Sequence, residues 1–294
     1  MGLLSRIIPL TAACALTGIT TATGQSFTAI NFPGAVETRA HGINDPGDIV
    51  GFYKTADNGP FHGYLRTSDG AFSTVDFPGA RETRAQGINA PGDIVGDYAD
   101  NQGGSHAFLW RSDSHTFATI DVQGAVSTAA FSIDSAGDIG GVYTNDFVVF
   151  HGFVRFADGS TVAVDFPGGS STVGVDMNDR GDIGGGYVDA QGIEHGFIRL
   201  KRTGVFTTVD PPGTAGTEVH AVNDRGDAVG PSCLDPSCGL GIPHGFLRLP
   251  DGTFIDIAFP GAAATQAAYI NNSGRIVGDY FTADLRRHGF VRNP

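Results

Sequence analysis

The chain is poor in basic residues and in helical pattern, and each shortage excludes a class of function or fold. Lys and Arg number 18 against 31 Asp and Glu, which gives a formal net charge of −13. Nucleic acids and anionic membrane surfaces would repel such a chain, so we expect neither as a partner. No stretch after residue 24 keeps the apolar period of a helix. An all-β fold is therefore predicted.

The sequence also lacks the common short motifs of catalysis and cofactor binding. It has no nucleophile elbow, no phosphate-binding loop, no dinucleotide fingerprint and no cluster of residues at metal-ligand spacing. We therefore expect no cofactor, and any catalytic activity would have to come from an unfamiliar arrangement of side chains.

Cysteine is scarce as well, and one of the 3 cysteines, Cys14, lies in an N-terminal segment unlike the rest of the chain. Residues 1–24 carry Arg6, then a short and mostly apolar stretch, and end in Ala22-Thr-Gly24. This pattern is typical of a signal peptide cleaved after Gly24. The stretch is too short and too polar to favour a permanent membrane span. We therefore expect residues 25–294 to form one secreted or periplasmic domain.

The other two cysteines, Cys233 and Cys238, lie in an insertion at residues 231–243. In an exported protein such a pair favours a local disulfide, which would contribute about 2 kcal/mol by restricting the unfolded chain. The alternative is a metal site made by the two thiols, for which His244 is the nearest histidine.

What the chain has in abundance is a repeat. A His-Gly-Phe-like triplet begins at six histidines, 44 to 49 residues apart: His62, His106, His151, His195, His244 and His288. This period is that of a four-stranded propeller blade. In the unit that starts at Thr83, residues 83–89, 93–98, 106–110 and 117–121 are short strand-like segments bounded by turn residues.

The two ends of the repeat array indicate how it closes. Residues 27–32 have the sequence of a fourth strand, whereas the chain finishes on a third strand, His288 to Arg292. We therefore predict a six-bladed β-propeller of four-stranded antiparallel blades, whose ring is closed by residues 27–32 in the last blade. We expect this ring to be a monomer.

The repeat resembles a known family. Gly87-Ile-Asn, the following Gly-Asp-Ile-Val-Gly-x-Tyr and the triplet His106-Ala-Phe resemble the HAF family of extracellular bacterial repeat proteins, which is named for that triplet. The other five triplets read His-Gly-Phe or His-Gly-Tyr, and the resemblance covers residues 27–294. It implies an exported bacterial repeat protein, and it implies no activity and no catalytic residue.

The polar residues that recur in every unit are expected to be structural. The six histidines stand one to a blade, too far apart to converge on one metal ion, so we expect each to bond to a neighbouring strand or turn. Turns such as Asn178 to Asp182 offer two or three side-chain oxygens. Calcium prefers six to eight, so a turn function is favoured and calcium binding is the alternative.

Differences between units predict where a function lies. A threonine recurs near the start of each first strand, at positions 38, 83, 128, 172, 217 and 265, and its surroundings are polar in three units. The polar residues there are Glu37, Arg39, His41, Glu82, Arg84, Glu218 and His220. Because first strands line a propeller's channel, these residues are predicted to form a cleft at its mouth.

Three functions are open for this cleft. Our leading expectation is non-catalytic binding of an extracellular glycan or protein. Neighbouring carboxylates and histidines could instead perform acid–base chemistry, as in a polysaccharide lyase or glycoside hydrolase. In the third interpretation the protein is a structural or surface-assembly component, and the charges form an ordinary rim.

Overall fold

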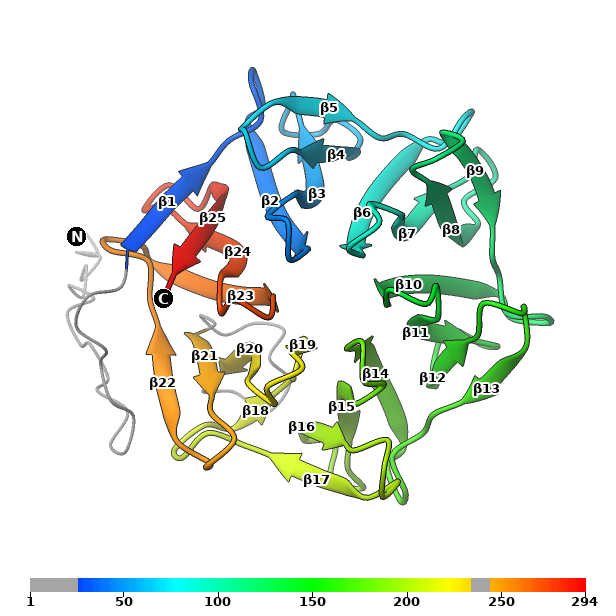
Figure 1. Ribbon diagram of the computed structural model, residues 1–294, viewed down its shortest axis with the longest axis vertical. Helices are drawn as coiled ribbons and strands as arrows, with labels where there is room; N and C mark the ends of the chain where they lie inside the picture. Colours follow the sequence, from blue (N-terminus) through cyan, green and yellow to red (C-terminus); the bar gives the residue numbers. More distant parts are fainter. Residues whose placement is uncertain (1–25, 234–243) are drawn as a thin grey trace, which may run out of the picture.

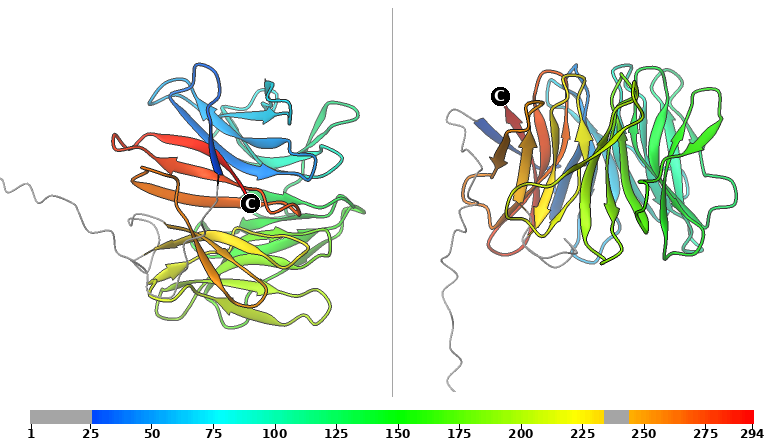
Figure 2. Two further views of the ribbon diagram at one scale, coloured as in Figure 1. Left: turned by 60° about the vertical axis from the view of Figure 1, so that its left-hand side comes forward. Right: turned by 90° about the horizontal axis from the view of Figure 1, so that it is seen from below.

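The computed structural model describes residues 26–233 and 244–294, and every regular element in these two ranges is a β-strand. The strands stand in groups around a central axis, with the first strand of each group nearest that axis (Figure 1). In side view the strands run between the two faces of a thick ring (Figure 2). This is the arrangement of a β-propeller, and the prediction of an all-β propeller is confirmed.

The strands follow the order of the repeat. Those of the first three units are β2 (Glu37–Ile43), β3 (Ile49–Lys54), β4 (His62–Arg66), β5 (Phe72–Thr74), β6 (Glu82–Ile88), β7 (Ile94–Ala99), β8 (Ser105–Arg111), β9 (Thr116–Thr119), β10 (Ser127–Ile133), β11 (Ile139–Thr144), β12 (Phe150–Arg155) and β13 (Thr161–Ala163). The fourth unit gives β14 (Ser171–Met177), β15 (Ile183–Val188), β16 (Glu194–Arg199) and β17 (Phe206–Val209).

The last two units depart slightly from this order. The fifth gives β18 (Gly216–Thr217), β19 (Ala221–Val222), β20 (Ala228–Cys233), β21 (His244–Arg248) and β22 (Phe254–Ile257). The sixth gives β23 (Ala264–Ile270), β24 (Ile276–Phe281) and β25 (Arg287–Asn293), and beside them lies the first strand of the chain, β1 (Ser26–Ile30).

The described strands form three sheets of four strands, one of five and one of eight. The eight-stranded sheet joins the strands of the second and third units through one parallel pair, Ser105 with Ser127. The first and last strands of the chain pair antiparallel, with Ser26 opposite Asn293 and Ile30 opposite Gly289. The N-terminal strand therefore lies at the outer edge of the sheet that ends the chain (Figure 1).

One large side chain of each triplet fills the centre of its unit. These side chains are at most 1% exposed: Tyr64, Phe108, Phe153, Phe197, Phe246 and Phe290. Phe108, for example, packs with Ile88 and Ile94 from the first two strands of its unit. Burial of such a side chain stabilises the fold by about 1.5–3 kcal/mol, so the triplet marks the core of each unit.

Five of the six triplet histidines bond to a side chain that lies one or two residues after the outermost strand of the sheet. Nδ1 lies 2.6–3.0 Å from a carboxylate oxygen in the pairs His62–Asp76, His106–Asp121, His151–Asp165 and His195–Asp210. His288 makes the same contact, at 2.7 Å, with Asn31 from the N-terminal segment. In the fifth unit the corresponding position is Ala258, which offers no side-chain acceptor.

Candidate functional site

Each complete first strand carries a one-residue β-bulge. In β2 the register moves from Ala40 opposite Gly51 to Gly42 opposite Val50, which leaves His41 unpaired between them. The bulged residues of the second, third, fourth and sixth units are Gln86, Phe131, Gly174 and Ala268. A bulge re-aims the extra side chain away from the ladder, and these strands lie nearest the axis (Figure 1).

A glycine on the neighbouring strand makes room for the bulge. A Cβ at Gly96 of β7 would overlap the carbonyl oxygen of Arg84, two residues before the bulged Gln86 on β6. A similar overlap with a carbonyl oxygen near the bulge would arise in the other five units, at Gly51, Gly141, Gly185, Gly230 and Gly278. Only glycine permits so close a backbone approach, which explains the last glycine of the Gly-Asp-Ile-Val-Gly pattern.

The fifth unit departs from the others at this position. Its first strand is split into β18 and β19, and Glu218 and His220 lie in the gap. Pro231 on β20 accepts a hydrogen bond from the backbone N–H of Glu218 at 3.2 Å. A proline has no N–H to return, so the ladder is interrupted there. His220 thus takes the place of a bulged residue.

The bulged residues and their neighbours line a central cavity of about 320 Å³. Its polar side consists of His41, Gln86, Glu218 and His220, from the first, second and fifth units. Its apolar side consists of Phe131, Val142, Phe150, Val173 and Val175, from the third and fourth units. Gly174, Asp176, Ala268 and Tyr269 complete the lining.

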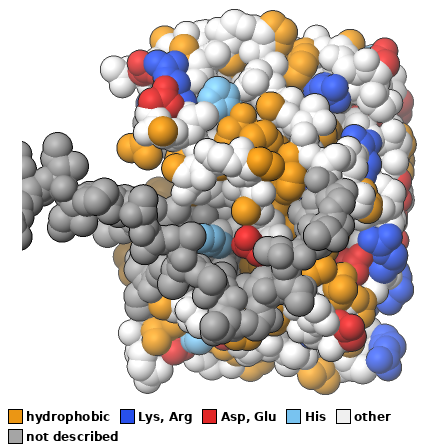
Figure 3. Space-filling model, turned by 90° about the vertical axis from the view of Figure 1, so that its left-hand side faces the viewer, with side chains coloured by type: hydrophobic (Ala, Val, Ile, Leu, Met, Phe, Trp, Pro, Cys, Tyr) orange, Lys and Arg blue, Asp and Glu red, His pale blue; other side chains and the backbone are white. Residues whose placement is uncertain are grey.

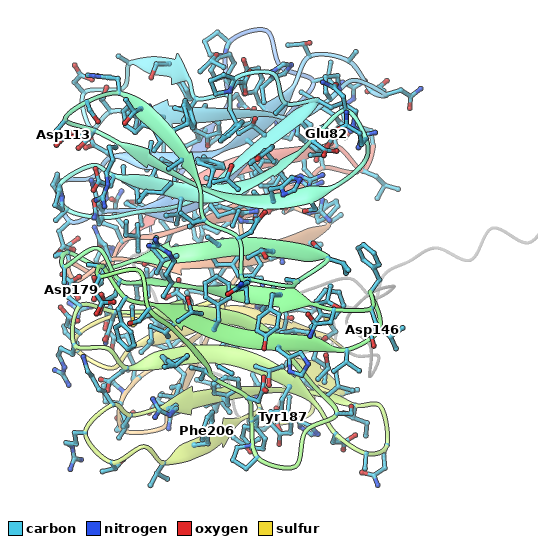
Figure 4. The ribbon with its side chains drawn as sticks, turned by 90° about the vertical axis from the view of Figure 1, so that its right-hand side faces the viewer. Glu82, Asp113, Asp146, Asp179, Tyr187 and Phe206 are labelled. Carbon is cyan, nitrogen blue, oxygen red and sulfur yellow. The ribbon has the colours of Figure 1, made fainter. Side chains whose placement is uncertain are left out.

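The structure divides the predicted site residues into two groups. His41, Glu218 and His220 line the cavity. The other four, Glu37, Arg39, Glu82 and Arg84, lie at the start of the first strands, which we call the entry end of the channel. Figure 4 shows Glu82 at the same edge of the molecule as Asp146, and Asp113 and Asp179 at the opposite edge.

The charges at the entry end neutralise one another. Arg39 pairs with Glu37 at 2.6 Å, and Lys54 reaches the other oxygen of Glu37 at 2.8 Å. Arg84 pairs with Glu82 at 3.0 Å and with Asp97 at 3.1 Å. Opposite charges two residues apart on one strand face the same side, so this rim offers few unpaired charges to a ligand.

Sequence reasoning missed Glu194, which lies beside the cavity at the start of β16 and hydrogen-bonds to Glu218. Glu218 also bonds to His220, whose Nε2 lies 2.7 Å from Oε2 of Glu218. Glu194 precedes a triplet histidine, where other units have Phe61, Ser105, Phe150 and Arg287. This variation between units was the one feature of the sequence that could have pointed to Glu194.

The two carboxyl groups share one proton. Burial, together with the neighbouring charge of Glu218, raises the pKa of Glu194 to about 9. Burial acts in the same direction on Glu218, but the hydrogen bond and the electrostatic interaction with His220 outweigh it and lower the pKa of Glu218. At neutral pH Glu194 is therefore the protonated partner and Glu218 the ionised one.

Burial also shifts the pKa values of two further cavity groups. Burial lowers the pKa of His41 to about 3, helped by the positive charges of Arg39 and His220. Asp176 is only 3% exposed, its Oδ1 has no hydrogen-bond partner, and burial raises its pKa well above the usual range. A neutral imidazole can donate or accept a hydrogen bond, and a neutral carboxyl group can do both.

The other end of the channel, which we call the turn end, holds a ring of asparagines around a small cavity of about 50 Å³. Each side-chain amide donates to a backbone carbonyl of the next unit, at 3.0–3.2 Å, in the pairs Asn44–Asn89, Asn89–Asp134, Asn178–Asn223, Asn223–Asn271 and Asn271–Asn44. The ring links neighbouring units at the axis, except that the third unit has Asp134 in place of the asparagine.

Some predictions lie outside the part of the chain that the structure describes. Cys233 ends β20 and is buried, but Cys238 and the signal-peptide residues 1–24 are outside the described ranges, so the disulfide and the leader stay predictions. Within residues 26–233 and 244–294, no group of three or more His, Cys, Asp or Glu side chains is placed to hold a metal ion. Those same ranges contain no helix with the length and apolarity to cross a bilayer.

No family model matches this chain, and a comparison with curated protein sequences found no match. Solved structures do match. A putative TolB from Agrobacterium tumefaciens is 14% identical with a TM-score of 0.60, covering 87% of this chain and 89% of that one. TolB from Acinetobacter baumannii is 14% identical with a TM-score of 0.57, covering 74% of this chain and 53% of that one.

A lectin is also similar. An Aleuria aurantia lectin mutant, solved in complex with Fucalpha1-6GlcNAc, is 13% identical with a TM-score of 0.55, covering 87% of this chain and 91% of that one. At this level of identity the likeness extends to the fold alone, which is that of a β-propeller.

Proposed function

We propose that this chain is an exported, six-bladed propeller of the HAF type that binds a glycan in its central cavity. Six repeat units of similar length support the blade number, and the pairing of β1 with β25 supports closure of the ring by the N-terminal strand. The signal-peptide pattern of residues 1–24 supports export to the periplasm or the medium.

The observation that carries glycan binding is the two-sided chemistry of the cavity. Its polar side offers donors and acceptors on His41, Gln86, Glu218 and His220, and its apolar side offers the rings of Phe131 and Phe150. A saccharide has the matching character, because hydroxyl groups surround the ring and C–H bonds form its faces. A mostly apolar pocket with a few placed polar groups is the usual form of a small-ligand site.

The geometry favours binding over glycoside hydrolysis. Retaining glycosidases hold their two carboxyl groups about 5–5.5 Å apart, and inverting enzymes hold theirs further apart to admit a water. Glu194 and Glu218 bond directly to each other instead. A pair in direct contact leaves no room for the scissile bond between its members.

A thermal-shift screen of the purified protein against soluble oligosaccharides tests this function. A ligand that binds only the folded state adds about 2.7 kcal/mol of stability at a hundredfold excess over its Kd, so the melting temperature rises. The shift should disappear in Phe131→Ala and persist in Ser114→Ala, because Ser114 is exposed in a hairpin loop and does not line the cavity. A shift that survives Phe131→Ala would place the site elsewhere, and no shift with any saccharide would count against glycan binding.

A further inference from the structure

The fourth and fifth units give the cavity an acidic wall. Asp176 of β14 and Glu218 line the cavity, and Glu194 of β16 bonds to Glu218 from behind. No Lys or Arg is among the lining residues. On the side of the molecule drawn in Figure 3, most Lys and Arg side chains lie toward one outer edge. The carboxyl groups of this wall therefore face the cavity without a permanent cation among its lining residues.

One carboxyl group of this wall, that of Asp176, is unsatisfied in the protein alone. Asp176 is 3% exposed and its Oδ1 has no hydrogen-bond partner, which is costly for a buried polar atom. Glu194 contacts Glu218 through a proton, and His220 is the basic side chain bonded to Glu218. A positively charged group entering the cavity would donate a hydrogen bond to Oδ1 of Asp176 and would replace the proton between the two glutamates as their shared positive charge.

The lining next to this wall suits the remainder of such a ligand. Phe131 and Phe150 are both half-buried, and they come from the unit next to the acidic wall. An aromatic face attracts a nearby cation as well as apolar C–H groups. The lining therefore suits a compact ring that carries an ammonium group on one side.

We propose that the cavity selects a glycan bearing a protonated amine, that is, a sugar with a free amino group, through Asp176 and the Glu194–Glu218 pair. This inference rests on the proposed glycan binding and adds the charge of the ligand. An N-acetylated sugar of the same shape has no charge to offer, and the site discriminates against it.

Binding by this route releases a proton. When the ammonium group approaches, the carboxyl group of Glu194 ionises, its proton leaves to solvent, and two carboxylates then face one cation. His220 bonds to the pair, and His41 and Asp176 share its cavity. Asp279 on β24 interacts with His220, and Arg39 and Arg287, nearer the entry end, interact with His41 and Asp279. Release of one proton makes the affinity rise by up to about tenfold per pH unit, while the ligand's own amine stays protonated.

Isothermal titration calorimetry of the purified protein tests the proposal. The probes are a glucosamine oligosaccharide and an N-acetylglucosamine oligosaccharide of equal length, each measured in two buffers of different ionisation enthalpy. We expect the glucosamine oligomer to bind at least about tenfold more tightly, with a heat that depends on the buffer. Asp176→Asn and Glu218→Gln should each weaken binding of the glucosamine oligomer far more than binding of the acetylated oligomer, so that the preference disappears.

The control variant is Asp113→Asn, which removes one carboxylate from the opposite edge of the molecule (Figure 4). If it weakens glucosamine binding as much as Asp176→Asn does, the attraction is that of the overall negative charge, and the proposal is overturned. Equal affinity for the two oligomers, lost in Phe131→Ala, would overturn the amine selectivity and keep the glycan function.

A third probe tests whether the cation site exists without glycan binding. Cyclohexylamine carries a ring and an ammonium group but no hydroxyl groups. If it binds in an Asp176-dependent manner while neither oligosaccharide binds, the cation site stands and the glycan function falls. If none of the three probes binds, both are overturned.

Discussion

The turn end and the bulge layer of the channel are built on the same six first strands, yet they differ in how they use the repeat. At the turn end, five of six units close the strand with asparagine, and each amide links to the next unit. In the bulge layer, only a few residues away, the six positions hold His41, Gln86, Phe131, Gly174, His220 and Ala268. Contacts between units require repetition, whereas a ligand site needs only one arrangement, so the repeat is free to vary there.

The largest expected effect is a difference in stability between two variants of one strand, one at a core residue and one at a cavity residue. Ile133 of β10 is 3% exposed, so Ile133→Ala should cost about 2–5 kcal/mol of unfolding free energy. Phe131, two residues earlier, is half-buried against the cavity, and Phe131→Ala should cost under about 1 kcal/mol while abolishing glycan binding. Denaturant unfolding of both variants measures this difference. Equal losses would mean that the bulge layer is ordinary core.

The asparagines at the turn end should contribute to stability and should not affect ligand affinity. Asn44 is 4% exposed, donates to the carbonyl of Asn89, and accepts from the N–H groups of Gly47 and Asp48. Asn44→Ala should therefore cost about 3 kcal/mol, because several buried groups lose their partners. The matched variant Asn44→Asp keeps the acceptor but loses the donor and places a second carboxyl group beside Asp48, as Asp134 stands beside Asp138, so a loss smaller than that of Asn44→Ala is expected. Thermal unfolding with and without ligand tests both, and a changed ligand affinity would contradict the separation.

The glutamate pair should give the bulge layer a dependence on pH. The pKa of Glu194 is raised to about 9 in the folded protein, so its contribution to stability is present below its unfolded pKa and is lost as pH rises toward 9. Glu194→Gln cannot ionise, so its melting temperature should increasingly exceed that of the wild type between about pH 5 and pH 9. Glu82→Gln on the ion-paired rim is the control. A constant difference across this range would mean that the pair does not share a proton.

The smallest expected effect is a gain in stability. The third unit has Asp134 where the others have asparagine, so no amide there reaches the fourth unit. Asp134→Asn keeps the acceptor for the N–H groups of Ala136 and Asp138 and adds the missing donor, for an expected gain of about 1 kcal/mol. Burial, with the charges of Asp138 and Asp179, raises the pKa of Asp134, so the wild type loses stability as pH rises. The gain in melting temperature should thus be larger at neutral pH than at about pH 4, and a loss would contradict it.

The sequence allowed the propeller to be predicted because each unit repeats its own core, as Phe108 and its equivalents show. It also pointed to His41, Glu218 and His220, because they differ from their counterparts in other units. It did not reveal the bulges, since a register shift leaves no mark on the bulged residue itself. Gly96 on the next strand is the residue that the bulge requires, but this requirement follows from a close backbone approach that only the structure shows.

Two other features were hidden for different reasons. Glu194 pairs with Glu218 of the following unit, 24 residues further along the chain, and no spacing rule connects them. Glu37 and Arg39 were predicted to face a ligand together with the others, but their alternation along one strand makes them partners of each other. Contacts within a strand follow from its two-residue period, whereas contacts between units depend on packing.

Asp134 interrupts the ring of asparagine hydrogen bonds between the third and fourth units, so the ring is open at that one place. Hydroxyl contacts close the gap instead: Ser132 Oγ accepts from Met177 N at 2.9 Å, and Ser135 donates to Asp179 at 2.7 Å. A groove of about 480 Å³ also runs between the third and fourth units, lined by Phe156 and Phe206. Circular permutation should therefore be tolerated best at this seam: a chain begun near residue 168, with its natural termini joined, would interrupt the junction that the asparagine ring supports least.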